Sequence, residues 1–371
     1  MNRAFSTYLD LVRFSAACLV YLWHANKRLL TTDILPASNY GHSSVIVFFV
    51  LSGLVIAFAT DTKESNWIDY GSSRLSRVFS VVIPTLLLTP LLDAAGRALY
   101  PALYDYPWDQ FGLRLLGSAL LLNEAWFVSI TFFSNVPYWS IAYEFWYYAA
   151  FGLFTFLPGR TRWIGLGAVL LLVGPKWLLL LPIWWAGVVL YRWRWPQQWS
   201  QGFSWCLVVV STLGIVLTHA IDFYAWSASQ VEPLIGKELF KQLTFSHNVP
   251  GDYLLGALVF LNFAGMRQVA PSLAPLMQRI ERPVKFLAGY TFTLYLLHQP
   301  LFLFWGAVLR GDPHGRQVFY SMTLLTALSV LVIGHFTERR RQPMRIWLGQ
   351  TLRRVASAIP HTGRQSPTPR P

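Results

Sequence analysis

Residues 8–25 read YLDLVRFSAACLVYLWHA, a run of aliphatic and aromatic side chains that also carries Asp10, Arg13 and His24. A helix needs about 20 mostly apolar residues to cross a bilayer. An ionisable side chain at the bilayer centre costs about 2.5–3.5 kcal/mol on insertion scales, so such side chains usually face protein or a water-filled cavity. The run therefore predicts a membrane helix whose ionisable side chains face the interior of the protein.

These three side chains fall on one stripe of that helix. A helix turns by about 100° and rises by about 1.5 Å per residue, so Arg13 and His24 lie within about 20° of each other and about 16 Å apart along the axis. Asp10 lies one turn before Arg13, at pairing distance. The structural alternative is that Asp10 only neutralises Arg13 and that His24 is an ordinary interfacial residue.

The composition of the whole chain is that of a membrane protein. Of its 371 residues 54% are hydrophobic and 13% are charged, whereas soluble domains have about 25% charged residues. The apolar runs are continuous and do not alternate with polar residues, which argues against a β-barrel. We therefore expect an all-α polytopic membrane protein. Ten segments are read as spans, at about 7–24, 42–60, 78–92, 138–157, 161–173, 177–191, 203–220, 251–264, 286–309 and 317–336.

Segment 111–133 is apolar but contains Arg114 and Glu124. The distribution of basic residues along the whole chain decides whether this segment is interpreted as a membrane span. If it does not cross, ten spans place most of the 30 Lys and Arg residues on the side of both termini. This bias is typical of cytoplasmic loops, so we expect both termini to be cytoplasmic. Residues 1–345 then form one transmembrane domain, and residues 346–371 form a basic, Pro-rich cytoplasmic tail that we expect to be disordered.

The formal charge of +13 does not indicate nucleic-acid binding, because the basic residues lie in short loops between apolar runs. The two cysteines, Cys18 and Cys206, lie inside apolar runs and are compatible with neither a disulfide framework nor a zinc site. We expect no metal site and no partner that is a nucleic acid.

Several motifs, spread in order over residues 8–343, resemble those of the acyltransferase-3 family of bacterial membrane acyltransferases. The pattern of an Arg, ten residues and a His in the first span is one of them. The Asp-Gly-Leu-Arg start that is common in the family reads Asp-Leu-Val-Arg here, and the second helix lacks the usual Gly-Val before its Phe pair. The other motifs are GHSSVIVFFVLSGLVIA (41–57), SRLSRVFSVVIP (73–84), YWSIAYEFWYYAAF (138–151), YTFTLYLLHQPL (290–301) and HFTERRRQP (335–343).

The resemblance implies a multi-pass enzyme of the bacterial cytoplasmic (inner) membrane. Such an enzyme transfers an acyl group, most often acetyl, from cytoplasmic acyl-CoA to a hydroxyl of an extracytoplasmic or lipid-linked carbohydrate, such as an exopolysaccharide or O-antigen. Acetyl-CoA or another acyl-CoA is then a co-substrate, with no bound cofactor. The expected partners are membrane lipids, the carbohydrate acceptor and polysaccharide-biosynthesis proteins.

This chemistry needs a group that removes a proton from a sugar hydroxyl, and His24 is the candidate general base because its ordinary pKa lies near neutrality. A covalent acyl-histidine is the alternative route. Glu144 is expected to orient His24 and stabilise its imidazolium. The structural alternative for Glu144 is a hydrogen bond to Ser140, one turn earlier on the same helix.

Arginine side chains are the candidates for acyl-CoA binding. Arg74 and Arg77 lie three residues apart, so we expect both to face one phosphate-binding pocket, although they also fit an ordinary cytoplasmic basic pair. Arg13 is expected to bind the pantetheine end or to polarise the thioester carbonyl. Tyr295 and His298 are expected either to line the same cavity or to form a hydrogen-bonded core pair.

Two other classes of protein share the spans and the buried charges. One is a transporter or flippase of a lipid-linked sugar, which inverted repeats would favour. The other is a non-catalytic partner in polysaccharide export, in which the polar stripe serves packing. Transfer of label from acetyl-CoA separates the three hypotheses.

Overall fold

The computed structural model of the protein describes residues 1–29, 40–194, 198–310 and 315–358. These residues form α-helices and short 3₁₀ turns, and no strand occurs among them. The α-helices are α1 (Arg3–Leu29), α2 (Tyr40–Lys63), α3 (Trp67–Leu99), α4 (Phe111–Ala119), α5 (Trp139–Phe156), α6 (Gly159–Val173), α7 (Leu181–Arg192), α8 (Gln201–Ala220), α9 (Phe223–Ile235), α10 (Lys237–Leu243), α11 (Val249–Val269), α12 (Ala274–Ala288), α13 (Thr291–Leu309), α14 (Arg316–Phe336) and α15 (Gln342–Ala358).

The prediction of an all-α polytopic membrane protein is confirmed. Within the described residues, seven helical segments are long and apolar enough to cross a membrane, and they contain α1, α2, α3, α8, α11, α13 and α14. The other three segments that the sequence predicted as spans correspond to α5, α6 and α7, which have 18, 15 and 12 residues. These helices are shorter than the about 20 residues that a full crossing needs.

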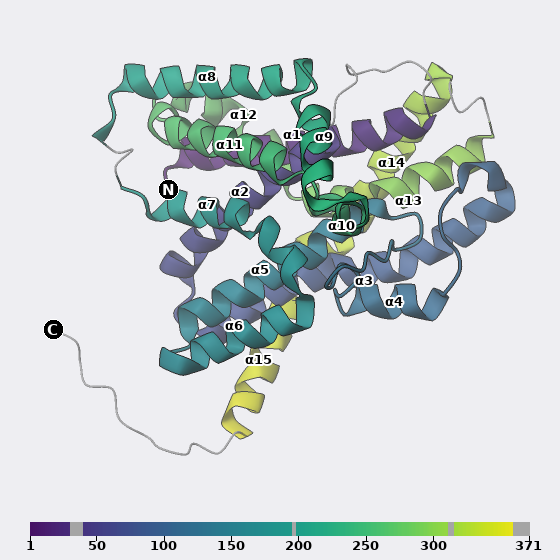
Figure 1. Ribbon diagram of the computed structural model, residues 1–371, viewed down its shortest axis with the longest axis horizontal. Helices are drawn as coiled ribbons and strands as arrows, with labels where there is room; N and C mark the ends of the chain where they lie inside the picture. Colours follow the sequence, from purple (N-terminus) through teal and green to yellow (C-terminus); the bar gives the residue numbers. More distant parts are fainter. Residues whose placement is uncertain (30–39, 195–197, 311–314, 359–371) are drawn as a thin grey trace.

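Helix α1 contacts α2, α12 and α13 (Figure 1). Helix α13 also packs against α3 and α14, and α8 packs against α11. Helices α2 and α7 approach so closely that a Cβ added at Gly53 would lie 1.9 Å from the carbonyl oxygen of Trp184. A Cβ added at Gly187 would likewise lie 2.0 Å from the carbonyl oxygen of Val50. Small residues allow this approach, which brings Trp184 against α2.

Segment 111–133 does not form a crossing helix. Helix α4 has nine residues, and the chain after it is irregular up to the start of α5. Lys176 Nζ fixes this irregular segment by donating to Glu124 Oε2 at 2.8 Å and to the Val128 carbonyl oxygen at 3.0 Å. The side chains of Lys176 and Glu124 are 0% and 3% exposed. The segment is thus held by a buried ion pair and by backbone hydrogen bonds of its turns, such as that from the Ile130 N–H to the Asn123 carbonyl oxygen at 2.8 Å.

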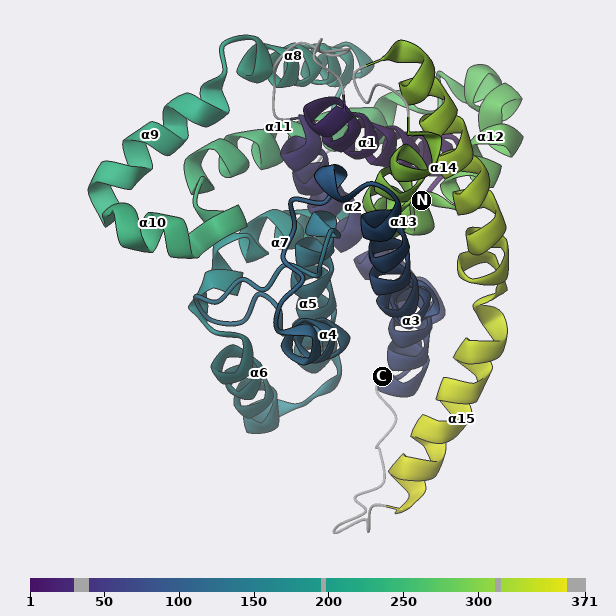
Figure 2. The same cartoon turned by 90° about the vertical axis from the view of Figure 1, so that its right-hand side faces the viewer.

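The segment that begins the expected disordered tail is instead helical. Helix α15 covers Gln342–Ala358 and packs against α3, and Figure 2 shows it leaving α14 and running along the side of the bundle. Arg353 on α15 lies 3.7 Å from Asp69 at the start of α3. The expectation of disorder is therefore corrected for residues 346–358, because these residues have a partner helix. The rest of the tail lies outside the described residues.

Candidate active site

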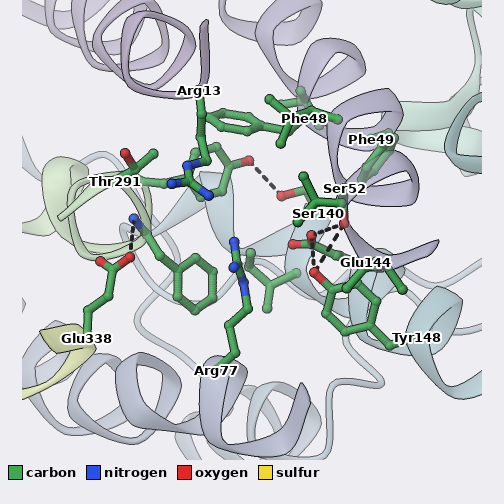
Figure 3. A pocket seen from close by; sticks show the side chains of 17 residues that line it. Arg13, Phe48, Phe49, Ser52, Arg77, Ser140, Glu144, Tyr148, Thr291 and Glu338 are labelled. Carbon is green, nitrogen blue, oxygen red and sulfur yellow. Dashed lines mark hydrogen bonds between the residues drawn. The ribbon is translucent and has the colours of Figure 1, made fainter. Parts of the chain in front are cut away.

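A small cavity of about 60 Å³ lies between α1, α2, α3, α5, the start of α13 and the turn that joins α14 to α15. Figure 3 shows that charged and polar side chains converge on it from opposite walls. These side chains are Arg13, Ser52, Arg77, Ser140, Glu144, Tyr148, Thr291, Tyr295 and Glu338. Five of the residues that the sequence analysis selected, from four helices, therefore meet in one place: Arg13, Arg77, Ser140, Glu144 and Tyr295.

The expected pairing of Asp10 with Arg13 is present in the structure. An Nη atom of Arg13 donates to Asp10 Oδ1 at 2.7 Å, and the two side chains are about four-fifths buried. Arg13 Nε is buried without a hydrogen-bond partner among the described residues. Asp10 therefore satisfies only part of the hydrogen-bonding capacity of the Arg13 guanidinium. The rest of the guanidinium borders the cavity.

Arg77 extends from α3 into the centre of the cavity (Figure 3). Its guanidinium makes no hydrogen bond to any residue that the structure describes, and its electrostatic partners include Glu144, Glu338 and Asp10. A guanidinium has five N–H donors and no hydrogen-bond acceptor. A guanidinium with free donors at a cavity can bind an anion or a carbonyl oxygen.

Glu144 is held by hydrogen bonds from α2 and from its own helix, and not by His24. Ser52 on α2 donates to Glu144 Oε1 at 2.6 Å, and the Tyr148 hydroxyl donates to the same oxygen. Trp184 on α7 in turn donates to Ser52 Oγ at 3.2 Å. The expectation that Glu144 orients His24 is therefore corrected, because its hydrogen bonds go to Ser52 and Tyr148. These two residues were missed in the sequence, although Tyr148 follows Glu144 by one helical turn.

Ser140 does not bond Glu144 either. Its hydroxyl lies 2.6 Å from the Tyr295 hydroxyl and donates to the Pro137 carbonyl oxygen at 3.3 Å. Ser140 and Tyr295 thus join α5 to α13 in the wall of the cavity. Both side chains line the cavity.

Arg74 does not share the cavity with Arg77. It forms an ion pair with Glu64, both side chains are less than one-tenth exposed, and its guanidinium lies 5.3 Å above the Tyr70 ring. Residues three apart on a helix differ by about 60° in direction, which is enough to send the two side chains to different neighbours. The expectation of one two-arginine pocket is corrected, because the turn between α2 and α3 places a carboxylate beside Arg74.

His24 and His298 form a pair of rings beside the cavity, with centroids 5.3 Å apart. His298 Nδ1 lies 2.8 Å and 3.0 Å from the carbonyl oxygens of Tyr295 and Leu294. Carbonyl oxygens only accept, so Nδ1 carries the hydrogen and Nε2 is an acceptor. Nε2 is buried and has no hydrogen-bond partner among the described residues.

The histidine pair lies near one end of the cavity, outside its lining. Thr291 and Tyr295 on α13 line the cavity, and His298 follows Tyr295 after about 4.5 Å of helix. Arg13 lines the cavity, whereas His24, on the same stripe of α1, lies beside His298. The rings of Tyr295 and His298 are in contact, with centroids 6.4 Å apart, and their hydrogen bond joins His298 Nδ1 to the Tyr295 carbonyl oxygen.

Glu338 is a site residue to which the sequence analysis gave no role. Its Oε2 accepts from the Thr293 backbone N–H at 3.0 Å and from the Thr293 hydroxyl at 3.2 Å. Its Oε1 accepts from the Phe292 N–H at 3.4 Å. The carboxylate thus caps the first turn of α13, where it also compensates the helix dipole. The sequence did not predict this cap, because Glu338 lies next to a basic cluster and approaches α13 only in the tertiary structure.

No group of three or more possible metal ligands occurs in the described part of the chain. The charged groups at the cavity are instead arginines and carboxylates. Arg13 and Arg77 can hold an anionic or carbonyl group, while His24 and His298 supply nitrogen atoms suited to proton transfer.

Comparison with known proteins agrees with this arrangement. A curated relative, "Acyltransferase MdmB" from Streptomyces mycarofaciens, is 27% identical over 165 residues, which is 41% of this chain and 41% of the relative. The aligned part is thus well under half of the relative's length. No solved structure matches the chain. The family profile described as an acyltransferase domain, that of the acyltransferase-3 family, matches residues 6–336. This match covers nearly the whole chain, which with its seven candidate membrane spans is a multi-pass membrane protein and belongs to the acyltransferase-3 family.

Proposed function

We propose that the protein is an acyl-CoA-dependent O-acyltransferase of the bacterial inner membrane. It takes an acyl group, acetyl foremost, from cytoplasmic acyl-CoA. It transfers the group to a hydroxyl of a carbohydrate that is extracytoplasmic or lipid-linked.

The observation that carries this proposal is the guanidinium of Arg77. It lies in the cavity beside Arg13, with no hydrogen bond to any described residue. The cavity of about 60 Å³ is much smaller than a whole CoA molecule, so it suits only part of the acyl-pantetheine arm. In this proposal the two guanidinium groups donate to carbonyl oxygens of the pantetheine arm, and the arm carries the thioester to His24, which lies about 16 Å from Arg13 along α1.

The second part of the proposal concerns proton transfer at His24. His24 removes the proton of the acceptor hydroxyl while that oxygen attacks the thioester carbonyl carbon. The carbon–sulfur bond then breaks, the CoA thiolate leaves, and the proton on His24 passes to the thiolate. His298 supports this cycle because its Nε2 can accept a hydrogen bond from the imidazolium that forms on His24.

Glu144 and Glu338 have separate roles in this proposal. Glu144, held by Ser52 and Tyr148, balances the charge of the nearby guanidinium of Arg77. Glu338 fixes the start of α13 and thereby the position of Thr291 and Tyr295 in the cavity wall. Arg74, already paired with Glu64, has a structural role.

The experiment follows radiolabelled acetyl-CoA. Membranes that contain the overproduced protein are incubated with the label, and the carbohydrate fraction is then separated from free acetate. We expect label in the carbohydrate fraction with the wild-type protein and none above background with His24→Ala. A wild-type protein that is folded and binds carbohydrate but never moves label would favour a flippase or an export partner.

A further inference from the structure

A second cavity, a groove of about 840 Å³, lies among α5, α6 and α7, and every residue that lines it is apolar. Aromatic rings make up much of its wall: those of Phe154, Trp163, Trp177 and Trp185. The groove lies within the range of about 300–1,000 Å³ that is common for small-molecule sites. Its wall is almost wholly apolar and offers ordered water few partners, so the groove suits a hydrocarbon occupant.

The position of the groove identifies the source of that hydrocarbon. Helices α6 and α7 have 15 and 12 residues and pack beside long apolar helices. On α6, Trp163 is 65%, Ile164 70% and Leu171 73% exposed. In a membrane protein such exposed apolar side chains face lipid, so the groove opens towards the bilayer. Lipid chains are therefore the molecules that reach it.

One end of the groove is positively charged. The guanidinium of Arg162 lies 5.0 Å above the ring of Phe154, which lines the groove. The guanidinium of Arg192 lies 5.9 Å above the ring of Phe151, one helical turn away on α5. Arg162 Nε donates to the Leu157 carbonyl oxygen, and neither of its Nη atoms has a hydrogen-bond partner among the described residues. The hydrogen bond from Arg192 to Asp61 is long, at 3.4 Å.

We infer that this groove binds an anionic phospholipid. An acyl chain lies along the apolar wall, and the phosphate is held at the end formed by Arg162 and Arg192. Guanidinium groups bind phosphate through a planar fork, and basic side chains at the membrane surface attract anionic lipids. A lipid held here fills the space beside α6 and α7, which are too short to cross the bilayer alone.

This lipid site goes beyond the proposed acyl transfer and is separate from the active site. The two cavities lie along α5, with Ser140, Glu144 and Tyr148 on the first and Ala150 and Phe154 on the second. A lipid that binds only the folded protein stabilises it. The predicted effect is therefore on lipid affinity and thermal stability, which do not depend on the acceptor or on acyl transfer.

Two glycines provide a matched pair of variants for the test. A Cβ added at Gly167, which lines the groove, meets no atom within 4 Å, and the same is true at Gly202 on α8. Gly167→Trp fills the groove, whereas Gly202→Trp places the same ring on α8. Arg162→Gln with Arg192→Gln removes the phosphate-binding end and leaves the groove open.

The purified, delipidated protein is titrated with phosphatidylglycerol or with phosphatidylcholine of the same chains. Bound lipid is counted by native mass spectrometry, and unfolding is followed by heating. We expect phosphatidylglycerol to bind more tightly and to raise the Tm of the wild type and of Gly202→Trp. We expect the double arginine variant to bind phosphatidylglycerol about 30-fold more weakly, which is about fivefold for each arginine. We expect Gly167→Trp to lose both the tighter binding of phosphatidylglycerol and the rise in Tm. Equal binding of the two lipids, or equal binding by the two tryptophan variants when both are monodisperse, would overturn the inference.

Discussion

The Nε2 atom of His298 is a buried acceptor without a hydrogen-bond partner in the described part of the chain, and its ring lies 5.3 Å from the ring of His24 between centroids. Backbone carbonyl oxygens fix the hydrogen of His298 on Nδ1. An acceptor nitrogen beside a candidate base suits a residue that stabilises the protonated base. His298 is thus the positioning residue of the proposed reaction.

Replacement of His298 tests that role. His298→Ala should lower kcat about 10–100-fold, the equivalent of the ~1.5–3 kcal/mol of a hydrogen bond to a charged group. His298→Gln keeps an acceptor oxygen and should recover part of the loss. The pH profile of kcat should also shift in His298→Ala, because the base loses a group that stabilises its charged form. Similar kcat values and pH profiles for both variants and the wild type would leave His298 with a packing role only.

Replacement of Arg77 tests the cavity. Arg77→Gln should lower turnover at low acetyl-CoA concentration about 10–100-fold by raising KM, because a hydrogen bond from a charged group to the pantetheine arm is worth ~1.5–3 kcal/mol. Arg77→Lys keeps the charge but loses the fork, so it should recover only part of the activity. The folded yield should stay near that of the wild type, because the guanidinium makes no hydrogen bond to a described residue. Full turnover at low acetyl-CoA concentration by a folded Arg77→Gln protein would contradict the assignment.

Arg74 is the matched comparison on the same helix. Arg74→Gln leaves the carboxylate of Glu64 buried and unpaired, and breaking such a pair costs about 3–5 kcal/mol. We expect a low folded yield for Arg74→Gln and recovery in the double variant Glu64→Gln, Arg74→Gln. Fluorescence-detected size-exclusion chromatography measures this. A stable Arg74→Gln protein with a raised KM for acetyl-CoA would instead show that Arg74 binds the substrate directly.

Glu281 gives a prediction about pH. Hydrogen bonds from Arg3 and Lys285 lower the pKa of the Glu281 carboxyl from its ordinary 4.5 to about 2. The carboxylate therefore stabilises the fold above about pH 4.5, and this stabilisation is lost as the pH falls towards 2. Glu281→Gln should lower the Tm in detergent at pH 7, and the gap from wild type should shrink below pH 4.5. A Tm difference between the wild type and Glu281→Gln that is the same at pH 7 and pH 3 would show that these ion pairs contribute nothing to stability.

Properties that depend on nearby residues were predicted well from the sequence. Continuous apolar runs predict helices, and the three-residue spacing of Asp10 and Arg13 predicts their ion pair, because both follow from the geometry of one helix. Contacts between distant segments were predicted less well. Glu64 beside Arg74, Ser52 beside Glu144 and Glu338 at the start of α13 all depend on how helices pack, which residue spacing does not encode. Helix α15 was missed because its basic, Pro-rich surroundings resemble those of a disordered tail.

The central claim is that the cavity and His24 together move an acyl group from acyl-CoA to a carbohydrate. The most direct measurement uses sealed proteoliposomes of uniform orientation, with labelled acetyl-CoA on the side of the protein's N-terminus. A bacterial glycolipid fraction is incorporated as the acceptor. We predict that wild-type protein transfers label to the glycolipid, and that His24→Ala reduces the rate by at least the ~10²–10⁴-fold typical of a lost general base. Transfer at the wild-type rate by a folded His24→Ala protein would contradict the account.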